Sequence, residues 1–334
     1  MTVQLLAFTA KGFALAQCLA AAFDGQAARC KAPLSLDVWT ARAFAESDAL
    51  VYVGAVGIAV RAIAPYIRSK TTDPAVVVVD ECGQFAVSLL SGHLGGANDL
   101  TRRIAAVCGS VPVITTATDA NGVFAVDEWA KYQNCCVVNS EKIKSVSAKL
   151  LAGDNILLYT DWPIAGQTPH GVTVTETPEY DVSLTIRRED SDALHLVPRI
   201  AVVGIGCKRG TPQTAIENAY DTWLAEHHIY KQAVIGICSI DLKQSEPGLT
   251  GFCRAHTLPF QTFSAGQLGQ AQGDFTPSAF VQNVTGVDNV CERSAVLGSG
   301  GTLYLKKTVR NGVTLAMALA PFAPNWQWRS EKTV

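Results

Sequence analysis

The chain has 334 residues, so at roughly 150 residues per domain it is long enough for about two globular units. Apolar residues make up 48% and charged residues only 17%, below the typical figure of about 25%, which argues against a disordered chain. Its 27 Lys and Arg and 29 Asp and Glu leave a net charge of −2, which excludes the broad positive surface that duplex nucleic acid requires. Any anionic ligand must therefore be bound by local groups.

The sequence also argues against membrane, secretory and metal-binding classes. The longest run without strongly polar side chains, residues 49–60, is shorter than the roughly 20 residues of a membrane span. No positive charge precedes Lys11 and no clear cleavage site follows, so we expect a cytoplasmic protein rather than a secreted one. The ten cysteines and six histidines form no C-x-x-C or H-E-x-x-H motif, so we expect reduced, buried thiols and no protein-bound metal.

Apolar strands and helices alternate along the first part of the chain. We expect strands at residues 3–8, 50–53, 76–79, 85–89 and 111–114, and helices at 13–23, 58–67 and 100–107. Strands that alternate with helices at this spacing indicate a mainly parallel sheet covered on both faces.

The middle of the chain differs in composition. Residues 134–160 predict a strand, a Lys-rich helix and a strand, whereas 161–189 are rich in Pro, Thr, Asp and Glu and indicate a connector. Apolar alternation at 172–175 and 182–186 predicts a short hairpin within it. The α/β pattern then resumes, with a strand at 200–203, a helix at 212–226, a strand at 233–240 and short elements to 319.

The predicted fold class is α/β, with two α/β domains of mainly parallel sheets joined by a variable middle segment. The boundaries are 1–134 for the first domain, 135–196 for the connector, 197–324 for the second domain and 325–334 for a tail. Trp326 and Trp328 in the tail could pack onto the body or lie at a subunit contact.

Three glycine-rich turns follow strands and precede helices, an arrangement that aims backbone N–H groups and the positive end of a helix at one anion. The first is GAVG at 54–57, where Gly54, Gly57 and the nearby Arg61 are candidates for binding a carboxylate. The glycines are equally well explained by close packing of the strand and the helix.

The second turn, SGHLGGANDL at 91–100, is the richest in functional groups. It follows a strand, at the carboxyl edge where open α/β sheets bind ligands. His93 titrates near neutrality, so it suits a general base or acid. Its neighbours that are candidates for substrate contact are Ser91, Gly92, Gly95, Gly96 and Asn98.

The segment TTATD at 115–119 would open beside this turn if the two preceding strands are neighbours. Thr115 and Thr116 are then further candidates for substrate contact. Asp119 could orient His93 or cap a helix.

The third turn, GIGCKRG at 204–210, resembles a dinucleotide fingerprint only weakly. Its spacing departs from G-x-G-x-x-G, and Asp241 lies further on than the roughly 20 residues expected of a ribose-binding acid. Lys208 and Arg209 suit acidic groups, and Gly204 and Gly206 are candidates for close backbone contact with a ligand.

Two later segments add candidates. SIDLKQSEPGL at 239–249 contributes Asp241 and Lys243, although a Lys243–Glu246 ion pair that fixes the loop explains them equally well. Glu292, in VCERSA at 290–295, could face a cleft or lie on the surface.

Taken together, these segments resemble the cobalt-precorrin-5A hydrolase family of cobalamin synthesis, CbiG. The resemblance covers both predicted domains and leaves residues 135–195 thinly matched. The segments that carry it are VGIAVRAIAP (56–65), DECGQFAVSLLSGHLGGANDL (80–100), PVITTATD (112–119), VVGIGCKRGTP (202–212), SIDLKQSEPGL (239–249), PSAFVQNVTGVDNVCERSAVL (277–297) and KKTVRNGVTLAMA (306–318).

This resemblance implies a hydrolase of the oxygen-independent branch of corrin synthesis. Members of the family act on a cobalt-bearing macrocycle whose δ-lactone joins a ring-A acetate to the extruded bridge carbon. Water opens the lactone, and that carbon leaves with its methyl group as acetaldehyde, giving cobalt-precorrin-5B. No resident cofactor is implied, because the cobalt is part of the substrate.

The chemistry requires an activated water, donors for the oxyanion and a base for the new hydroxyl. One base could serve twice, first for the water and then for the hydroxyl. From residue types, we expect His93 to be that base and Asp119 to be its orienting partner. The backbone N–H groups of Gly95 and Gly96 are the expected oxyanion donors.

The cobalt-corrinoid substrate carries several acetates and propionates, so we expect it in the cleft between the two domains. The three turns with Arg61, Lys208, Arg209 and Lys243 would hold it, and residues 161–195 would form the rim or a lid. Transient contacts with neighbouring pathway enzymes are expected, and contacts with nucleic acid or membrane are not. The alternatives are a non-catalytic carrier of the corrinoid intermediate and a dinucleotide-binding oxidoreductase, which the missing acidic residue disfavours.

Overall fold

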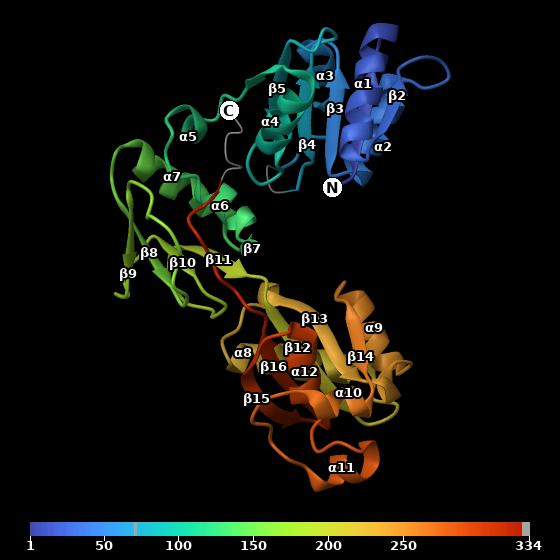
Figure 1. Cartoon of the computed structure of the whole chain (residues 1–334), viewed down its shortest axis with the longest axis vertical. Coiled ribbons are helices and arrows are strands. Elements are labelled where there is room, and N and C mark those ends of the chain that lie inside the picture. Colours follow the sequence, from blue (N-terminus) through green and yellow to red (C-terminus); the bar gives the residue numbers. More distant parts are fainter. Residues whose placement is uncertain (70–71, 329–334) are drawn as a thin grey trace.

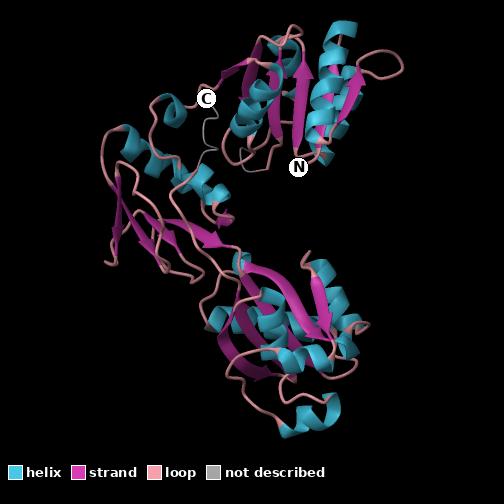
Figure 2. Cartoon of the chain, viewed as in Figure 1, coloured by secondary structure: helices cyan, strands magenta, loops and turns pink. Residues whose placement is uncertain are grey.

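The structure, a computed structural model, describes residues 1–69 and 72–328. Three β-sheets follow one another along the chain and lie at the top, left and bottom of Figure 1. Helices flank each of them, as Figure 2 shows. The predicted α/β class with mainly parallel sheets is confirmed, but the described residues form three sheets where two were expected.

The N-terminal sheet has six strands. They are β1 (Val3–Ala7), β2 (Gln26–Arg29), β3 (Ala49–Val53), β4 (Ala75–Val79), β5 (Phe85–Leu90) and β6 (Val111–Val113). Its helices are α1 (Ala10–Phe23), α2 (Leu36–Glu46), α3 (Val56–Ile63) and α4 (Ala97–Cys108). In the order β2-β1-β3-β4-β5-β6, β1 to β4 are parallel, β5 runs antiparallel to β4, and β6 is parallel to β5.

Both faces of this sheet are buried. Successive side chains of a strand point to opposite faces. On one face Val51 packs with Leu19 of α1 and Leu100 of α4. On the other face Tyr52 packs with Ile63 of α3. This double covering explains why β3 and β4 are continuous apolar runs rather than alternating ones.

The middle segment folds into a second sheet. Its strands are β7 (Cys135–Val137), β8 (Ile156–Thr160), β9 (Val172–Thr175), β10 (Val182–Leu184) and β11 (Leu194–Pro198), and its helices are α5 (Ala117–Ala120), α6 (Val126–Tyr132) and α7 (Ile143–Leu151), with a 3₁₀ turn η1 (Ser140–Lys142). In the order β7-β11-β10-β8-β9, all neighbours are parallel except β7 and β11.

The predicted hairpin is therefore wrong. β9 and β10 lie on opposite sides of β8, and each pairs parallel to it. Alternating apolar residues indicate that a strand forms but carry no information on which strand it joins. Residues 161–189 consequently contribute β9 and β10 to a sheet and are not a simple connector.

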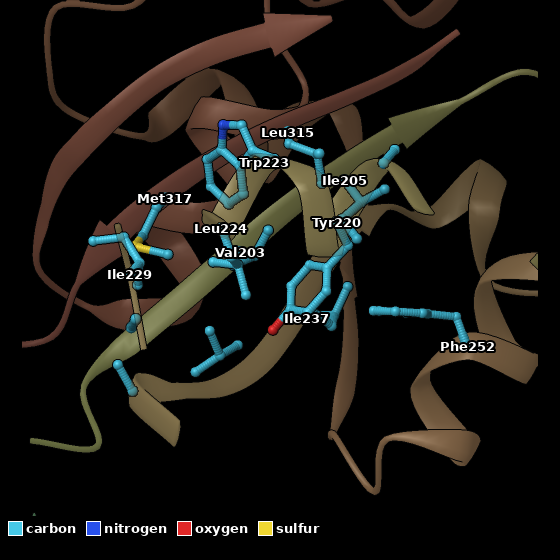
Figure 3. Packing of buried hydrophobic residues seen from close by; sticks show 14 of the residues in the cluster. Val203, Ile205, Tyr220, Trp223, Leu224, Ile229, Ile237, Phe252, Leu315 and Met317 are labelled. Carbon is cyan, nitrogen blue, oxygen red and sulfur yellow. The ribbon is translucent and has the colours of Figure 1, made fainter. Parts of the chain in front are cut away.

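The C-terminal sheet contains β12 (Ala201–Cys207), β13 (Val234–Ile240), β14 (Phe260–Phe263), β15 (Thr302–Arg310) and β16 (Val313–Leu319). Its helices are α8 (Gln213–Glu226), α9 (Pro247–Ala255), α10 (Ala265–Gln270), α11 (Ala279–Thr285) and α12 (Cys291–Ser299), with 3₁₀ turns η2 (Lys231–Ala233) and η3 (Asp241–Lys243). In the order β14-β13-β12-β16-β15, the first three strands are parallel and the last two form an antiparallel hairpin. In Figure 3, Tyr220 and Trp223 of α8 pack over Val203, Ile237 and Met317 of the strands.

The tail returns from the C-terminal sheet to the middle unit, as the red trace in Figure 1 shows. Trp326 stacks on Trp129 of α6 with ring centroids 5.3 Å apart, and the Trp129 indole N–H donates to the carbonyl of Asn325 at 2.7 Å. Trp326 is only 6% exposed. Trp326 and Trp328 thus pack onto the body, and the predicted tail residues 329–334 lie outside the described residues.

The cysteines and the apolar helices were the subject of two expectations from composition. All ten cysteines are free thiols, but Cys18 and Cys82 are exposed, so the predicted burial holds for only part of the set. Within the described residues, no helix is both long enough and apolar enough to cross a bilayer.

Candidate functional site

The turn that carries His93 joins β5 to α4. Because β5 is antiparallel to β4, the end of β5 lies where β4 begins, with Leu90 paired to Val76. β6 is parallel to β5, so residues 115–119 open at this same edge. The prediction that the two loops adjoin is confirmed, whereas their placement at the carboxyl edge of the parallel strands is wrong.

Three carboxylates surround the imidazole of His93. Its Nε2 lies 3.1 Å from Oδ2 of Asp119 and 3.7 Å from Oε1 of Glu128, and its Nδ1 lies 3.1 Å from Oδ2 of Asp127. The His93 side chain is 15% exposed, and the carboxylates are more deeply buried. Asp127 and Glu128 belong to the first turn of α6, so the cluster joins the N-terminal sheet to the middle unit.

This environment favours the protonated form of His93. Burial opposes the positive charge, but hydrogen bonds to Asp119 and Asp127 and the negative charges of Asp127 and Glu128 outweigh it and raise the pKa of His93 from 6.5 to about 10. At neutral pH His93 is therefore an imidazolium that donates from both nitrogens. It can act as a base only after it has given up a proton.

Asp119 is fixed by several donors. Arg102 pairs with its Oδ1, while the Asn98 amide donates to its Oδ2 at 2.9 Å and the Thr116 hydroxyl donates to the same oxygen. Asn98 is fully buried and accepts a hydrogen bond from Ser88 of β5 at 2.7 Å. Asn98 and Thr116, predicted as substrate contacts, thus hold the carboxylate that contacts His93. Thr115 is exposed beside them.

The glycines of this turn have different structural roles. The Gly96 N–H donates to the carbonyl of His93 at 2.9 Å, so its predicted role as an oxyanion donor is wrong. A Cβ on Gly95 would lie 2.3 Å from Cβ of Ser91, and one on Gly92 would lie 2.8 Å from Oδ1 of Asn98. The Ser91 hydroxyl is buried, with no hydrogen-bond partner among the described residues. The Ser91 hydroxyl is therefore a hydrogen-bond donor with no acceptor among the described residues.

The first glycine turn is not part of this cluster. Gly54 and Gly57 follow β3, which ends beside the end of β4, at the opposite edge of the sheet from His93. The Arg61 guanidinium donates to the carbonyl of Gly57 at 3.2 Å. A Cβ on Gly54 would lie 2.7 Å from the ring of Phe8, which supports the close-packing explanation of this glycine.

Gly204 and Gly206 of the third turn lie within β12. β12 extends to Cys207 because it pairs with β16 as far as Val313. A Cβ on Gly204 would lie 1.8 Å from the carbonyl oxygen of Cys291, so Gly204 is required for the approach of α12. Gly206 has no such neighbour, since the nearest atom to its Cβ would be 3.7 Å away.

The polar groups beyond β12 and β13 form a separate cluster in the C-terminal unit. Lys208, Arg209 and Asp241 are exposed there. Lys243 pairs with Glu246 at 3.2 Å, and Glu246 also accepts the Gly210 N–H at 2.7 Å. Burial of Glu246 opposes its ionisation, but these donors lower its pKa. The structure thus contains the Lys243–Glu246 ion pair that was the alternative explanation of this loop.

Glu292 is neither at a cleft nor on the surface. It is fully buried and accepts hydrogen bonds from the backbone N–H groups of Thr276 and Lys307, both at 2.7 Å, and from the Thr276 hydroxyl at 2.9 Å. Its predicted substrate contact is therefore wrong, because all of its observed bonds are internal.

Glu292→Gln should destabilise the protein by about 1.5–3 kcal/mol, because the amide places an N–H where a carboxylate oxygen now accepts charge-assisted hydrogen bonds. Urea unfolding measures this loss, and KM of the folded variant should stay at the wild-type value. Unchanged stability with a raised KM would show that Glu292 contacts the substrate.

The ligand atoms of His93, Asp119 and Glu128 lie within 4.8 Å of one another, a spacing that a metal ion could bridge. In the described structure the Arg102 guanidinium and the His93 imidazolium already supply positive charge to these carboxylates. The donor set therefore fits a hydrogen-bonded acid–base cluster.

The raised pKa of His93 predicts how stability depends on pH. A group whose pKa is raised on folding stabilises the protein fully below its unfolded pKa of 6.5 and loses this contribution as pH rises to about 10. Relative to His93→Gln, the wild-type free energy of unfolding should fall across this window by a few kcal/mol. Urea titrations of both proteins at several pH values measure it, and parallel curves would contradict it.

Comparisons with known proteins cover almost the whole chain. Residues 38–119 match the family model described as cobalamin synthesis G N-terminal, 124–202 match the cobalamin biosynthesis central region and 201–318 match the cobalamin synthesis G C-terminus. The cobalt-precorrin-5A hydrolase of Salmonella typhimurium is 36% identical, covering 96% of this chain and 98% of that protein. That of Priestia megaterium is 32% identical over 84% of this chain and 80% of its own. The crystal structure of CobE, a protein from the cobalamin biosynthetic pathway, is 26% identical over 37% of this chain and 92% of its own, with a TM-score of 0.35.

Proposed function

Since this chain belongs to the cobalt-precorrin-5A hydrolase family, we propose that it opens the δ-lactone of cobalt-precorrin-5A and releases acetaldehyde, giving cobalt-precorrin-5B in anaerobic cobalamin synthesis. The observation that supports this function best is 36% identity to a cobalt-precorrin-5A hydrolase along 96% of the chain. The protein is accordingly an enzyme, a hydrolase that acts on a corrinoid intermediate.

The His93 cluster is the proposed catalytic site, and it starts the reaction with a proton on the imidazole. In the first step, water adds to the lactone carbonyl while a carboxylate of the cluster accepts the water proton. The carbon–oxygen bond of the lactone then breaks, and the His93 imidazolium gives its proton to the departing oxygen. Asp119 and Asp127, each 3.1 Å from a ring nitrogen, hold the imidazole in place.

The second step uses the neutral imidazole that the first step leaves. It accepts the proton of the new hydroxyl, the carbon–oxygen double bond of acetaldehyde forms, and the carbon–carbon bond to the ring breaks. The electron pair of that bond passes into the conjugated macrocycle. A single residue therefore serves first as acid and then as base, which revises the order expected from the sequence.

The oxyanion that forms on the lactone carbonyl requires donors that the turn does not use internally. The Ser91 hydroxyl is one, because it is buried without a hydrogen-bond partner among the described residues. The Gly95 N–H is the other proposed donor, and the Gly96 N–H is committed to the His93 carbonyl.

The proposal needs no resident cofactor, because the cobalt enters as part of the substrate. A cytoplasmic location and transient contacts with the enzymes that precede and follow it belong to the same proposal. They are consistent with a labile intermediate that is passed from one enzyme to the next.

The test is to incubate the purified protein with the cobalt-bearing lactone and to trap acetaldehyde. Stoichiometric acetaldehyde together with the mass of the ring that has gained water and lost this two-carbon unit supports the hydrolase. Binding of the corrinoid without acetaldehyde would instead support the carrier alternative, which no structural observation favours.

A further inference from the structure

A basic pocket of about 780 Å³ lies between the middle unit and the C-terminal unit. Its positive residues are Lys131, Arg199 and Lys231, and no Asp or Glu is among the described residues that line it. Its size is within the range of small-molecule sites. A pocket lined by cations and by no acid, in a protein of net charge −2, points to an anionic ligand.

The basic pocket adjoins the His93 turn. Leu94, the next residue after His93, forms part of its wall. The Lys131 ammonium donates to the carbonyl of Leu94 at 3.1 Å. Lys131 lies on α6, one turn after Asp127, which contacts the imidazole. A ligand in this pocket would therefore have one edge next to the proposed catalytic cluster.

The cations at the other side of the basic pocket can reach a ligand. Arg199 is exposed and forms no ion pair with any residue that the structure describes. Lys231 pairs with Asp221 at 2.9 Å, but both side chains are about half exposed, and such surface pairs are weak. Both groups can thus turn toward a carboxylate without the loss of a buried contact.

The rest of the wall is suited to a flat, apolar ring. Val137 comes from the middle sheet, Val234 from the C-terminal sheet, and Leu258 from the turn that precedes β14. Apolar surface with a few cations at its rim matches a tetrapyrrole whose periphery carries carboxylates.

We propose that the basic pocket binds the peripheral carboxylates of the macrocycle through Arg199, Lys231 and Lys131, with the lactone edge toward His93. This inference rests on the proposed function and names the residues that bind its substrate. It replaces the three glycine turns as the place where the ring is held, because those turns lie at separate sheet edges.

The test is a comparison of Arg199→Gln, Lys231→Gln and the double variant with Lys149→Gln, a half-exposed lysine of the middle unit outside the pocket. Each lost charge-assisted contact should raise KM for the cobalt-bearing lactone by about tenfold with kcat unchanged. The Kd of uroporphyrin, a polycarboxylated tetrapyrrole used as a probe, should rise in parallel. Higher ionic strength should weaken binding to the wild type more than to the double variant.

Values of KM and probe Kd in the double variant equal to those of Lys149→Gln would overturn the pocket assignment. Circular dichroism checks that each variant is folded. If the double variant is unfolded, Arg199→Gln alone, at an exposed position, decides whether the pocket assignment holds. Probe binding separates the two proposals. Suppose that the wild type releases no acetaldehyde, while the Arg199 and Lys231 variants bind uroporphyrin more weakly than the wild type does. The basic pocket then stands and the hydrolase proposal fails.

Discussion

His93→Gln is expected to lower kcat for acetaldehyde release by roughly 10²–10⁴-fold, the usual contribution of a positioned acid–base group. Glutamine can still form a hydrogen bond to the surrounding carboxylates, but it cannot transfer a proton at neutral pH. The measurement is the rate of trapped acetaldehyde at saturating substrate. His170→Gln is the matched control, because His170 is exposed in the middle unit and should have no effect.

The pH dependence of kcat/KM distinguishes the two possible starting forms of His93. If the imidazolium acts first as an acid, kcat/KM should stay level between pH 7 and 9 and fall as the pH passes the His93 pKa of about 10. If a neutral imidazole had to act first as a base, kcat/KM would rise about tenfold per pH unit over the same range. A rising profile would therefore reject the proposed order of steps, and an active His93→Gln would reject the site.

The sequence predicted which segments form the first sheet but not the direction of every strand. Residues 85–89 were correctly expected to be a strand, because they are apolar and follow a turn. Apolar patterning reports burial and is the same for either direction of a strand. The antiparallel pairing of β5 with β4 depends on tertiary packing, and this pairing moved the His93 turn to the opposite edge from Gly54.

The carboxylates that surround His93 were only partly predictable. Asp119 follows a strand and was correctly placed beside His93. Asp127 and Glu128 were missed because acidic residues are common in the first turn of any helix, where they interact with the helix dipole. The signal in the sequence was the acidic pair Asp127 and Glu128 after an apolar segment. This pair does not indicate that α6 packs against the turn that carries His93, 34 residues before Asp127.

Substitution of Gly204 tests whether the third glycine turn needs its glycine for a ligand or for packing against α12. A dinucleotide site or a corrinoid site would need its glycines for ligand approach, whereas the structure needs Gly204 for the approach of α12. The Cβ of Gly204→Ala would lie 1.8 Å from a backbone oxygen, which cannot rotate away as a side chain can. We therefore expect a loss of about 3 kcal/mol or more in the free energy of unfolding, at the upper end of overpacking effects.

Gly206→Ala is the matched control for this substitution. It lies two residues further along the same strand, and its Cβ would meet its nearest neighbour at an ordinary 3.7 Å. Its free energy of unfolding should change by less than about 1 kcal/mol. Equal losses in the two variants, measured by urea unfolding, would mean that the contact with α12 is not the reason for glycine at 204. A large loss at 204 alone would show that the motif is a packing requirement of this sheet, and that its likeness to a dinucleotide fingerprint follows from the close approach of a helix.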